Sequence, residues 1–153
     1  MKKGVLLLSI IITVIFLTGC GQKSDYYGTY IFESVDYQSP VLSTTADYIE
    51  EIMRGTKYTV TEKEFKIESP ELTEEFKSPK YIKGELPANP GPLADVYSFL
   101  GDEVKWQIDI LTEEGEKTRY RLYASKDSLW VSFYNNTPDG TEIIMYIYKI
   151  SKT

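Results

Sequence analysis

The chain has 153 residues and a formal net charge of −6, with 23 acidic residues, 17 basic residues and no histidine. This length suits one domain, and an acidic chain is unsuited to nucleic acid because it repels the phosphate backbone. The lack of histidine removes the side chain that most often serves as a general base or a metal ligand near neutral pH.

The first twenty residues have the pattern of a secretory signal. Lys2 and Lys3 precede an apolar stretch over residues 5–17, and the run Leu17-Thr18-Gly19-Cys20 follows. A positive start, an apolar middle and small residues at the cleavage point indicate a helical signal peptide over residues 1–19. The final run resembles the lipobox of bacterial lipoproteins, which reads Leu, a small residue, Gly or Ala, and then Cys. The resemblance implies that the thiol at its end receives a diacylglycerol and that the chain is cut just before it.

Cys20 is the only cysteine of the chain, and two other interpretations compete with lipidation. A lone cysteine is more often a small buried residue, but Cys20 lies between two glycines, where no core would form. A membrane-spanning anchor would need about 20 apolar residues, more than this stretch provides. We therefore expect a lipid anchor that holds the protein at the extracytoplasmic face of the cell membrane. Residues 20–25 would be the lipidated cysteine and a short tether, and residues 26–153 one folded domain.

Cleavage before Cys20 would leave 15 basic and 23 acidic residues, a net charge of −8. An acidic surface is not attracted to an anionic membrane, so the lipid would provide the attachment. With the thiol acylated no disulfide can form, and the fold must depend on its hydrophobic core.

Eight segments of the mature chain predict β-strands, because they are rich in aromatic and β-branched residues or alternate between apolar and polar positions. Short polar turns separate most neighbouring segments, as at Glu113-Glu114-Gly115-Glu116, and these turns favour hairpins. The predicted strands are residues 27–35, 57–61, 64–68, 80–86, 103–111, 118–124, 129–135 and 141–150.

One helix is predicted between the first and second strands. Thr44 can cap it, with Asp47 three residues later in a weak capping box, and Gly55 ends it. Its apolar stripe consists of Tyr48, Ile49, Ile52 and Met53. Further along, the proline-rich segment 87–92 predicts a loop, and segment 93–100 is compatible with a short helix or a strand.

Strands joined mostly by short loops predict a mainly β fold, a single antiparallel meander. Such a sheet protects its edges best by closing into a barrel. A barrel of roughly eight strands is just wide enough for side chains or for one small ligand.

The start of the first strand, Gly28-Thr29-Tyr30, resembles the Gly-x-Trp opening of lipocalin-like (calycin-like) proteins. The helix after the first strand and the hairpins that follow fit the same pattern. In that family the opening aromatic residue packs under a basic residue near the end of the last strand, which implies a pair between Tyr30 and Lys149. A cation over an aromatic ring contributes about 0.5–2 kcal/mol. The sequence departs from the family in having Tyr for Trp and Lys for Arg, and in lacking its Thr-Asp-Tyr loop motif.

No reactive group of residues stands out in the mature chain. There is no Gly-x-Ser-x-Gly motif and no glycine-rich phosphate loop. The run 135–146 fails as a calcium loop, because it begins with Asn135 and has Tyr146 where Glu is needed. The sequence leaves open a carboxylate pair from distant strands. We expect no enzyme activity, no cofactor and no metal.

Arg119 and Arg121 share a strand face opposite Tyr120 and Leu122. If the apolar face lines the barrel, both arginines lie outside in solvent. The reverse register would place them inside, where they could bind an anion.

Two functions fit these expectations. The first is a binding lipoprotein that takes a small apolar or amphipathic ligand through an open barrel end, with the helix 44–54 and the loop 87–92 at the mouth. Its expected wall residues are Tyr30, Trp106, Ile108, Tyr120, Leu122 and Phe133. The second is a filled barrel that acts as an interaction module, inhibiting or stabilising another envelope protein through an exposed patch of Tyr123, Trp130 and Tyr134.

Overall fold

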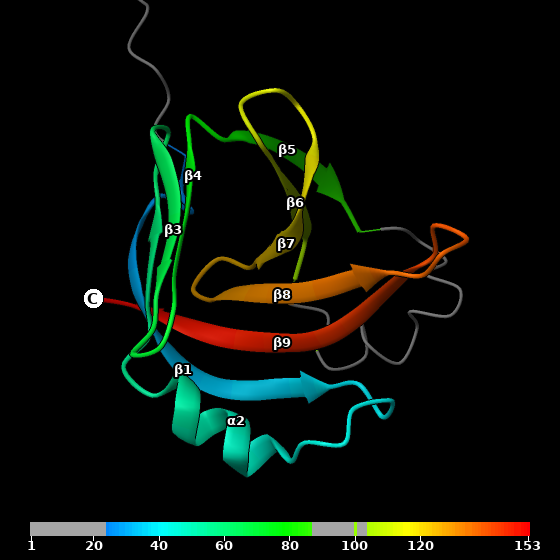
Figure 1. Ribbon diagram of the computed structural model, residues 1–153. Helices are drawn as coiled ribbons and strands as arrows, with labels where there is room; N and C mark the ends of the chain where they lie inside the picture. The colour runs from blue at the N-terminus through cyan, green and yellow to red at the C-terminus, as the bar shows by residue number, and fades with distance from the viewer. Residues whose placement is uncertain (1–23, 87–99, 101–103) are drawn as a thin grey trace, which may run out of the picture.

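The computed structural model describes residues 24–86, 100 and 104–153. Within them the protein is mainly β, with an antiparallel nine-stranded sheet that curls into a half-barrel and one helix beside it (Figure 1). The elements are β1 (Gly28–Gln38), α2 (Ala46–Met53), β2 (Lys57–Val60), β3 (Glu64–Glu68), β4 (Thr73–Lys77), β5 (Lys80–Glu85), β6 (Trp106–Leu111), β7 (Lys117–Ala124), β8 (Leu129–Asn136) and β9 (Glu142–Lys152).

Several predictions fall outside the described residues. These are the signal peptide 1–19, the lipidated Cys20, the loop 87–92 and most of the segment 93–100. The eight predicted strands each correspond to an observed strand, with ends that differ by a few residues at most.

The sheet has the order β4-β3-β2-β1-β9-β8-β7-β6-β5, so the first and last strands pair in its centre. In Figure 1, β2, β3 and β4 rise on one side of the pair β1–β9, while β8, β7, β6 and β5 continue on the other. The two edges, β4 and β5, are consecutive in the chain but not hydrogen-bonded to each other. The fold is therefore barrel-like, with its opening between β4 and β5.

The strand β4 was not predicted, which is why the sheet has nine strands and not eight. Residues Ser78 and Pro79 connect β4 to β5 at the opening of the sheet. Ser78 has a positive φ of 47° and its backbone N–H donates to the carbonyl of Lys63 at 2.8 Å. Pro79 has no N–H to donate. The chain turns sharply here, and β5 leaves without pairing to β4.

The helix α2 forms where the sequence predicts it, but one residue later at its start. The side chain of Thr45, not Thr44, accepts a hydrogen bond from the backbone N–H of Tyr48. Gly55 follows the helix with a φ of +81°, which a glycine adopts without strain. Ile49 is the buried residue of its apolar stripe, and α2 lies against β1 (Figure 1).

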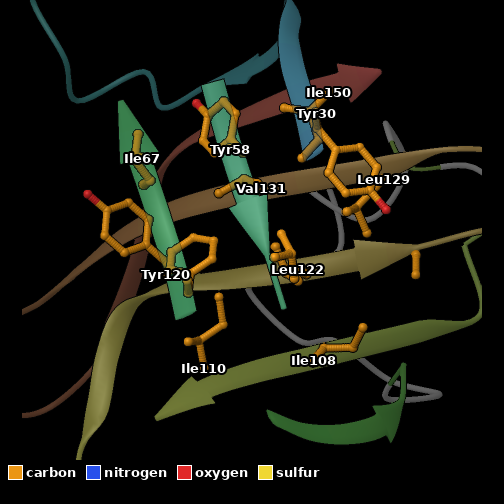
Figure 2. Packing of buried hydrophobic residues seen from close by; sticks show 13 residues of the cluster. Tyr30, Tyr58, Ile67, Ile108, Ile110, Tyr120, Leu122, Leu129, Val131 and Ile150 are labelled. Carbon is orange, nitrogen blue, oxygen red and sulfur yellow. The ribbon is translucent and has the colours of Figure 1, made fainter. Parts of the chain in front are cut away.

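The concave face of the curled sheet carries the main hydrophobic core (Figure 2). Its members point inward as the alternation predicts: Ile108 and Ile110 from β6, Tyr120 and Leu122 from β7, and Val131 from β8. Each of these side chains is at most 9% exposed. We call this set, with its neighbours on β1–β3 and β9, the inner core.

A second core lies on the opposite face of β7, β8 and β9. There Tyr123, Trp130 and Tyr134 pack with Leu100 and Val104. The prediction that these three aromatic residues form an exposed patch is therefore wrong, since none is more than 6% exposed. Alternation placed them correctly outside the curl, but it could not reveal that residues distant in the sequence cover that face.

Candidate binding cleft

The six predicted wall residues all belong to the inner core or pack against it. They are Tyr30, Trp106, Ile108, Tyr120, Leu122 and Phe133. Ile108 and Leu122 have no exposed surface and fill the middle of the curled sheet. Space remains toward its two ends, where Tyr30 and Trp106 line one opening and Tyr120 and Phe133 line another.

The larger opening, which we call the Tyr30 cleft, has a volume of about 810 Å³. Its base is apolar and comes from four strands: Tyr30 from β1, Trp106 from β6, Leu129 from β8 and Ile150 from β9. Tyr30, Leu129 and Ile150 are buried parts of the inner core, and Trp106 is half-buried against it. The cleft is therefore the place where the apolar interior reaches the surface.

Four lysines surround this base: Lys83, Lys105, Lys126 and Lys152. The lining contains only two acidic residues, Asp25 and Asp127, so the cleft has a local excess of positive charge in an acidic chain. The ammonium nitrogen of Lys83 lies 4.2 Å from the centre of the Trp106 ring, within the range of a cation–π interaction.

A short turn between β7 and β8 positions part of this rim. The backbone N–H of Ser125 donates to the carbonyl of Ser128 at 3.0 Å. The hydroxyl of Ser125 accepts hydrogen bonds from the N–H groups of Asp127 and Ser128. This turn presents Lys126 and Asp127 at the mouth of the cleft.

The structure does not pair Tyr30 with Lys149. Lys149 forms an ion pair with Glu33 at 3.1 Å, and its strand partner Trp130 belongs to the core on the opposite face of the sheet. Lys152 is the residue opposite Tyr30 in the β1–β9 register. The resemblance assigned the basic position to Lys149, but Lys149 and Lys152 are three residues apart in β9, so their side chains point to opposite faces of the sheet.

Gly28 explains how Lys152 approaches the tyrosine. A Cβ atom at Gly28 would lie 2.9 Å from Cε of Lys152 and 3.3 Å from Cε2 of Tyr30. A larger residue at this position would push the lysine away from the ring. Steric crowding therefore favours glycine at the first position of the Gly28-Thr29-Tyr30 motif in this chain.

Tyr30 is fixed at its hydroxyl end. The hydroxyl donates to the carbonyl of Tyr26 at 2.8 Å, and the ring of Tyr26 packs edge-on against Tyr27 and Tyr81. Burial raises the pKa of Tyr30, so the phenol stays neutral at physiological pH. The cleft therefore has a rigid, uncharged base beneath its charged rim.

The smaller opening, which we call the Tyr58 groove, has a volume of about 240 Å³ and is almost entirely apolar. Helix α2 contributes Ile49, Ile52 and Met53 to its wall, as the sequence predicts for one end of the barrel. The sheet contributes, among others, Tyr58, Ile67, Tyr120, Val131, Phe133 and Tyr148. Two of the predicted wall residues therefore belong to a different opening from Tyr30 and Trp106.

Arg121 departs from both predictions made for it. It lies on the outer face of β7, but it is 4% exposed. Its guanidinium donates to Asp109 at 2.5 Å and to Glu142 at 2.9 Å. Arg119 is exposed, as predicted. Because two carboxylates already neutralise it, Arg121 is a structural cation and not an anion site.

Two of the six predicted wall residues, Tyr30 and Trp106, line the Tyr30 cleft, and its four lysines were not predicted. Lys83 and Lys152 lie in strands, on the same face as core residues. The alternation of side chains along these strands could therefore have indicated that both point toward the cleft. Lys105 and Lys126 lie outside the strands, and only the folded chain brings them to the same opening.

Among the residues that the structure describes, no group of three or more acidic or cysteine side chains could hold a metal ion. The same residues contain no helix that is long and apolar enough to span a membrane. No protein-family model, no curated protein and no solved structure matches the chain.

Proposed function

We propose that this chain is a membrane-anchored extracytoplasmic lipoprotein that binds a small amphipathic anion in the Tyr30 cleft. The apolar part of the ligand would lie on Tyr30, Trp106 and Leu129, and its anionic group would meet the lysine rim. The observation that carries the proposal is the combination of a cleft of about 810 Å³ with an apolar base and four lysines around it.

Size and charge both support a ligand of this kind. Sites for small molecules commonly have volumes of about 300–1,000 Å³ and combine apolar walls with a few polar groups. Hydrogen bonds between an ammonium group and a carboxylate or phosphate are stronger than those between neutral groups. The acidic surface elsewhere would repel an anion, so the lysine rim would favour its binding at this opening.

The position of the cleft suits a ligand that comes from the membrane. Asp25, the last residue of the expected tether, and Tyr26, the first residue after it, line the cleft. Residues 21–25 would span at most about 17 Å when fully extended. An anchor at Cys20 would therefore keep the opening close to the lipid surface, where fatty acids and lysolipids have apolar chains and anionic groups.

The resemblance to lipocalin-like proteins is part of this proposal. Two observations support it: β1 pairs with β9, and Tyr30 lies opposite a basic residue, Lys152, near the end of the last strand. We propose a lipocalin-like barrel whose opening between β4 and β5 distinguishes it from a closed one.

Octanoate and 1-octanol test the proposal, since they share an alkyl chain and differ in charge. The protein used would be residues 20–153 with the substitution Cys20→Ser. We expect octanoate to shift the methyl resonances of Leu129 and Ile150 in this protein. We expect 1-octanol to bind more weakly than octanoate. Replacing Lys83 and Lys152 together by Gln should weaken octanoate binding about tenfold, equal to about 1.4 kcal/mol, and leave 1-octanol unchanged.

Lys57 and Lys77 supply the matched control. Both are exposed strand lysines outside the cleft lining, so replacing them by Gln removes the same charge and should leave octanoate binding nearly unchanged. Equal losses in the two double variants would show that net charge alone attracts the anion. Unshifted Leu129 and Ile150 resonances would refute binding in the cleft.

The filled middle of the sheet favours the interaction module as a second candidate. Its partner would not pair with the sheet edges easily, because β4 and β5 carry charged side chains such as Glu75, Lys77 and Lys80 that disfavour edge pairing. A stoichiometric protein complex from detergent-solubilised envelope, together with no octanoate binding, would support this candidate over the first.

A further inference from the structure

The Tyr58 groove is a second site, separate from the Tyr30 cleft. The two openings share no lining residue, and the fully buried side chains of Ile108 and Leu122 belong to the core between them. Figure 2 shows the hydroxyl oxygens of Tyr58 and Tyr120 directed to one end of the inner core, and that of Tyr30 directed to the other. A ligand in the groove would therefore meet a different set of polar atoms.

The polar atom that distinguishes the groove is the hydroxyl of Tyr58. This residue lines the groove and is 1% exposed, and its hydroxyl has no hydrogen-bond partner in the structure as described. Buried hydroxyls nearly always have a partner, because leaving one unpaired costs about 1–3 kcal/mol. An unpaired donor in the wall of an apolar opening indicates that a bound molecule supplies the missing acceptor.

The surroundings of this hydroxyl define the charge of that molecule. Burial raises the pKa of both Tyr58 and Tyr148, so both phenols remain neutral donors. The carboxylate of Glu74 lines the same groove and already accepts a hydrogen bond from the hydroxyl of Tyr120 at 2.6 Å. The other carboxylate oxygen of Glu74 lies 3.9 Å from Nε of Arg119, so this charge is already compensated, and a charged group on the ligand would lose its hydration in an apolar opening.

We propose that the Tyr58 groove binds a small neutral compound, an apolar ring with one carbonyl or ether oxygen that accepts a hydrogen bond from the Tyr58 hydroxyl. An apolar cavity of about 150 Å³ is enough for benzene, and the groove of about 240 Å³ has room for a ring with a short substituent. The hydroxyl is covered in the ligand-free chain. A ligand would therefore reach it only after part of the groove wall moves, and Met53, half-buried in that wall, has a flexible side chain that adapts readily.

Acetophenone and ethylbenzene test the inference, because they have nearly the same shape and only acetophenone carries a carbonyl. The full chain, held in lipid nanodiscs with labelled isoleucine methyl groups, would be titrated with each. We expect acetophenone to shift the methyl resonances of Ile49, Ile52 and Ile67 with an affinity about fivefold higher than that of ethylbenzene, the worth of one hydrogen bond. Ile150, in the other opening, should not shift, and benzoate should not bind in the groove.

Tyr58→Phe isolates the hydroxyl, since it removes one atom and keeps the ring. We expect this variant to bind acetophenone about fivefold more weakly and ethylbenzene unchanged, so that the two affinities become equal. Tyr48→Phe is the matched control, because Tyr48 belongs to the same helix end of the molecule but is 54% exposed. It should preserve the preference for acetophenone.

Several results would overturn the inference. Equal affinities for the two probes in the unaltered chain would show that no acceptor is recognised. If Tyr58→Phe still binds acetophenone more tightly than ethylbenzene, a donor other than the Tyr58 hydroxyl recognises the carbonyl. Shifts confined to Ile150, or no shifts with either probe, would show that the groove is not a site. None of these results bears on octanoate binding in the Tyr30 cleft.

Discussion

Arg121 shows how a single residue acquires a role that its sequence position does not reveal. Its strand position faces away from the inner core, where a cation is usually solvated. The second core covers it, and the side chain is neutralised by Asp109 and Glu142. The guanidinium also lies over the Tyr134 ring, 5.2 Å from its centre. Removing one partner would leave the buried charge less well compensated, which is costly.

Glu142→Gln tests this arrangement through its pH dependence. Burial alone would raise the pKa of Glu142, but hydrogen bonds and charge from Lys117 and Arg121 outweigh it and hold the pKa below 4.5. The folded state therefore gains stability from the ionised carboxylate above about pH 4.5, and loses it as the pH falls through the lower folded-state value. We expect the variant to be less stable by about 1–3 kcal/mol near neutral pH, measured by urea unfolding.

The difference between Glu142→Gln and the unaltered chain should shrink as the pH falls through the lowered folded-state pKa of Glu142, because the carboxyl is then protonated and both chains carry a neutral group at this position. Glu113→Gln is the control, since Glu113 is an exposed turn residue and its replacement should change stability little at neutral or low pH. A difference that stays constant with pH would contradict the role assigned to the carboxylate.

At the scale of elements, the edge strand β4 is the clearest departure from the predicted fold. Its five residues, Thr73–Lys77, include three charged side chains, so the segment lacks the apolar content by which strands are recognised. The signal that it does contain is that Glu74 and Phe76 share one face of the strand, which is less exposed than the other face. Phe76 packs near Phe65 and Tyr120 of the inner core. The strand forms because it pairs with β3 and because the Phe76 ring packs in the inner core. Both contacts belong to the tertiary structure.

The start of helix α2 gives an element-scale prediction. Thr45→Ala removes the hydroxyl that accepts from the N–H of Tyr48, and we expect it to lower the free energy of unfolding by about 1 kcal/mol. Thr44→Ala is the matched control: its hydroxyl contacts that of Tyr146 at an exposed position, so the loss should stay within about 0.5 kcal/mol. Thermal unfolding followed by circular dichroism measures both. A larger loss of stability in Thr44→Ala than in Thr45→Ala would show that Thr44 caps the helix, as the sequence predicts.

At the scale of the whole molecule, the curled sheet separates two openings of different chemistry. Lysines surround the larger one, and the smaller one has the carboxylate of Glu74 and an unpaired hydroxyl. The separation follows from the size of the curl, since a barrel of about this size is filled in its middle by side chains. Asp25 and Tyr26, near the start of the described chain, line the larger opening, so the proposed tether would join the domain there.

Cys20→Ala tests the anchor that this orientation requires. We expect the unaltered protein to incorporate labelled fatty acid and to sediment with membranes, and the variant to do neither, because the proposed lipid would be attached to this thiol. Ser24→Ala, in the tether, should retain both properties. Unchanged membrane partition of Cys20→Ala without any label would refute the lipid anchor.

The sequence by itself determined the strands and their faces, because alternation and turn residues are local properties. It predicted the helix and eight of the nine strands that the described residues form. Tertiary structure decided the rest: the burial of Tyr123 and Arg121, the partner of Tyr30 and the division of the interior into two openings. These depend on which distant segments meet, such as Leu100 against β7–β9 and Lys152 against Gly28. No local pattern encodes such contacts, since each arises only when the sheet curls and brings both segments to one place.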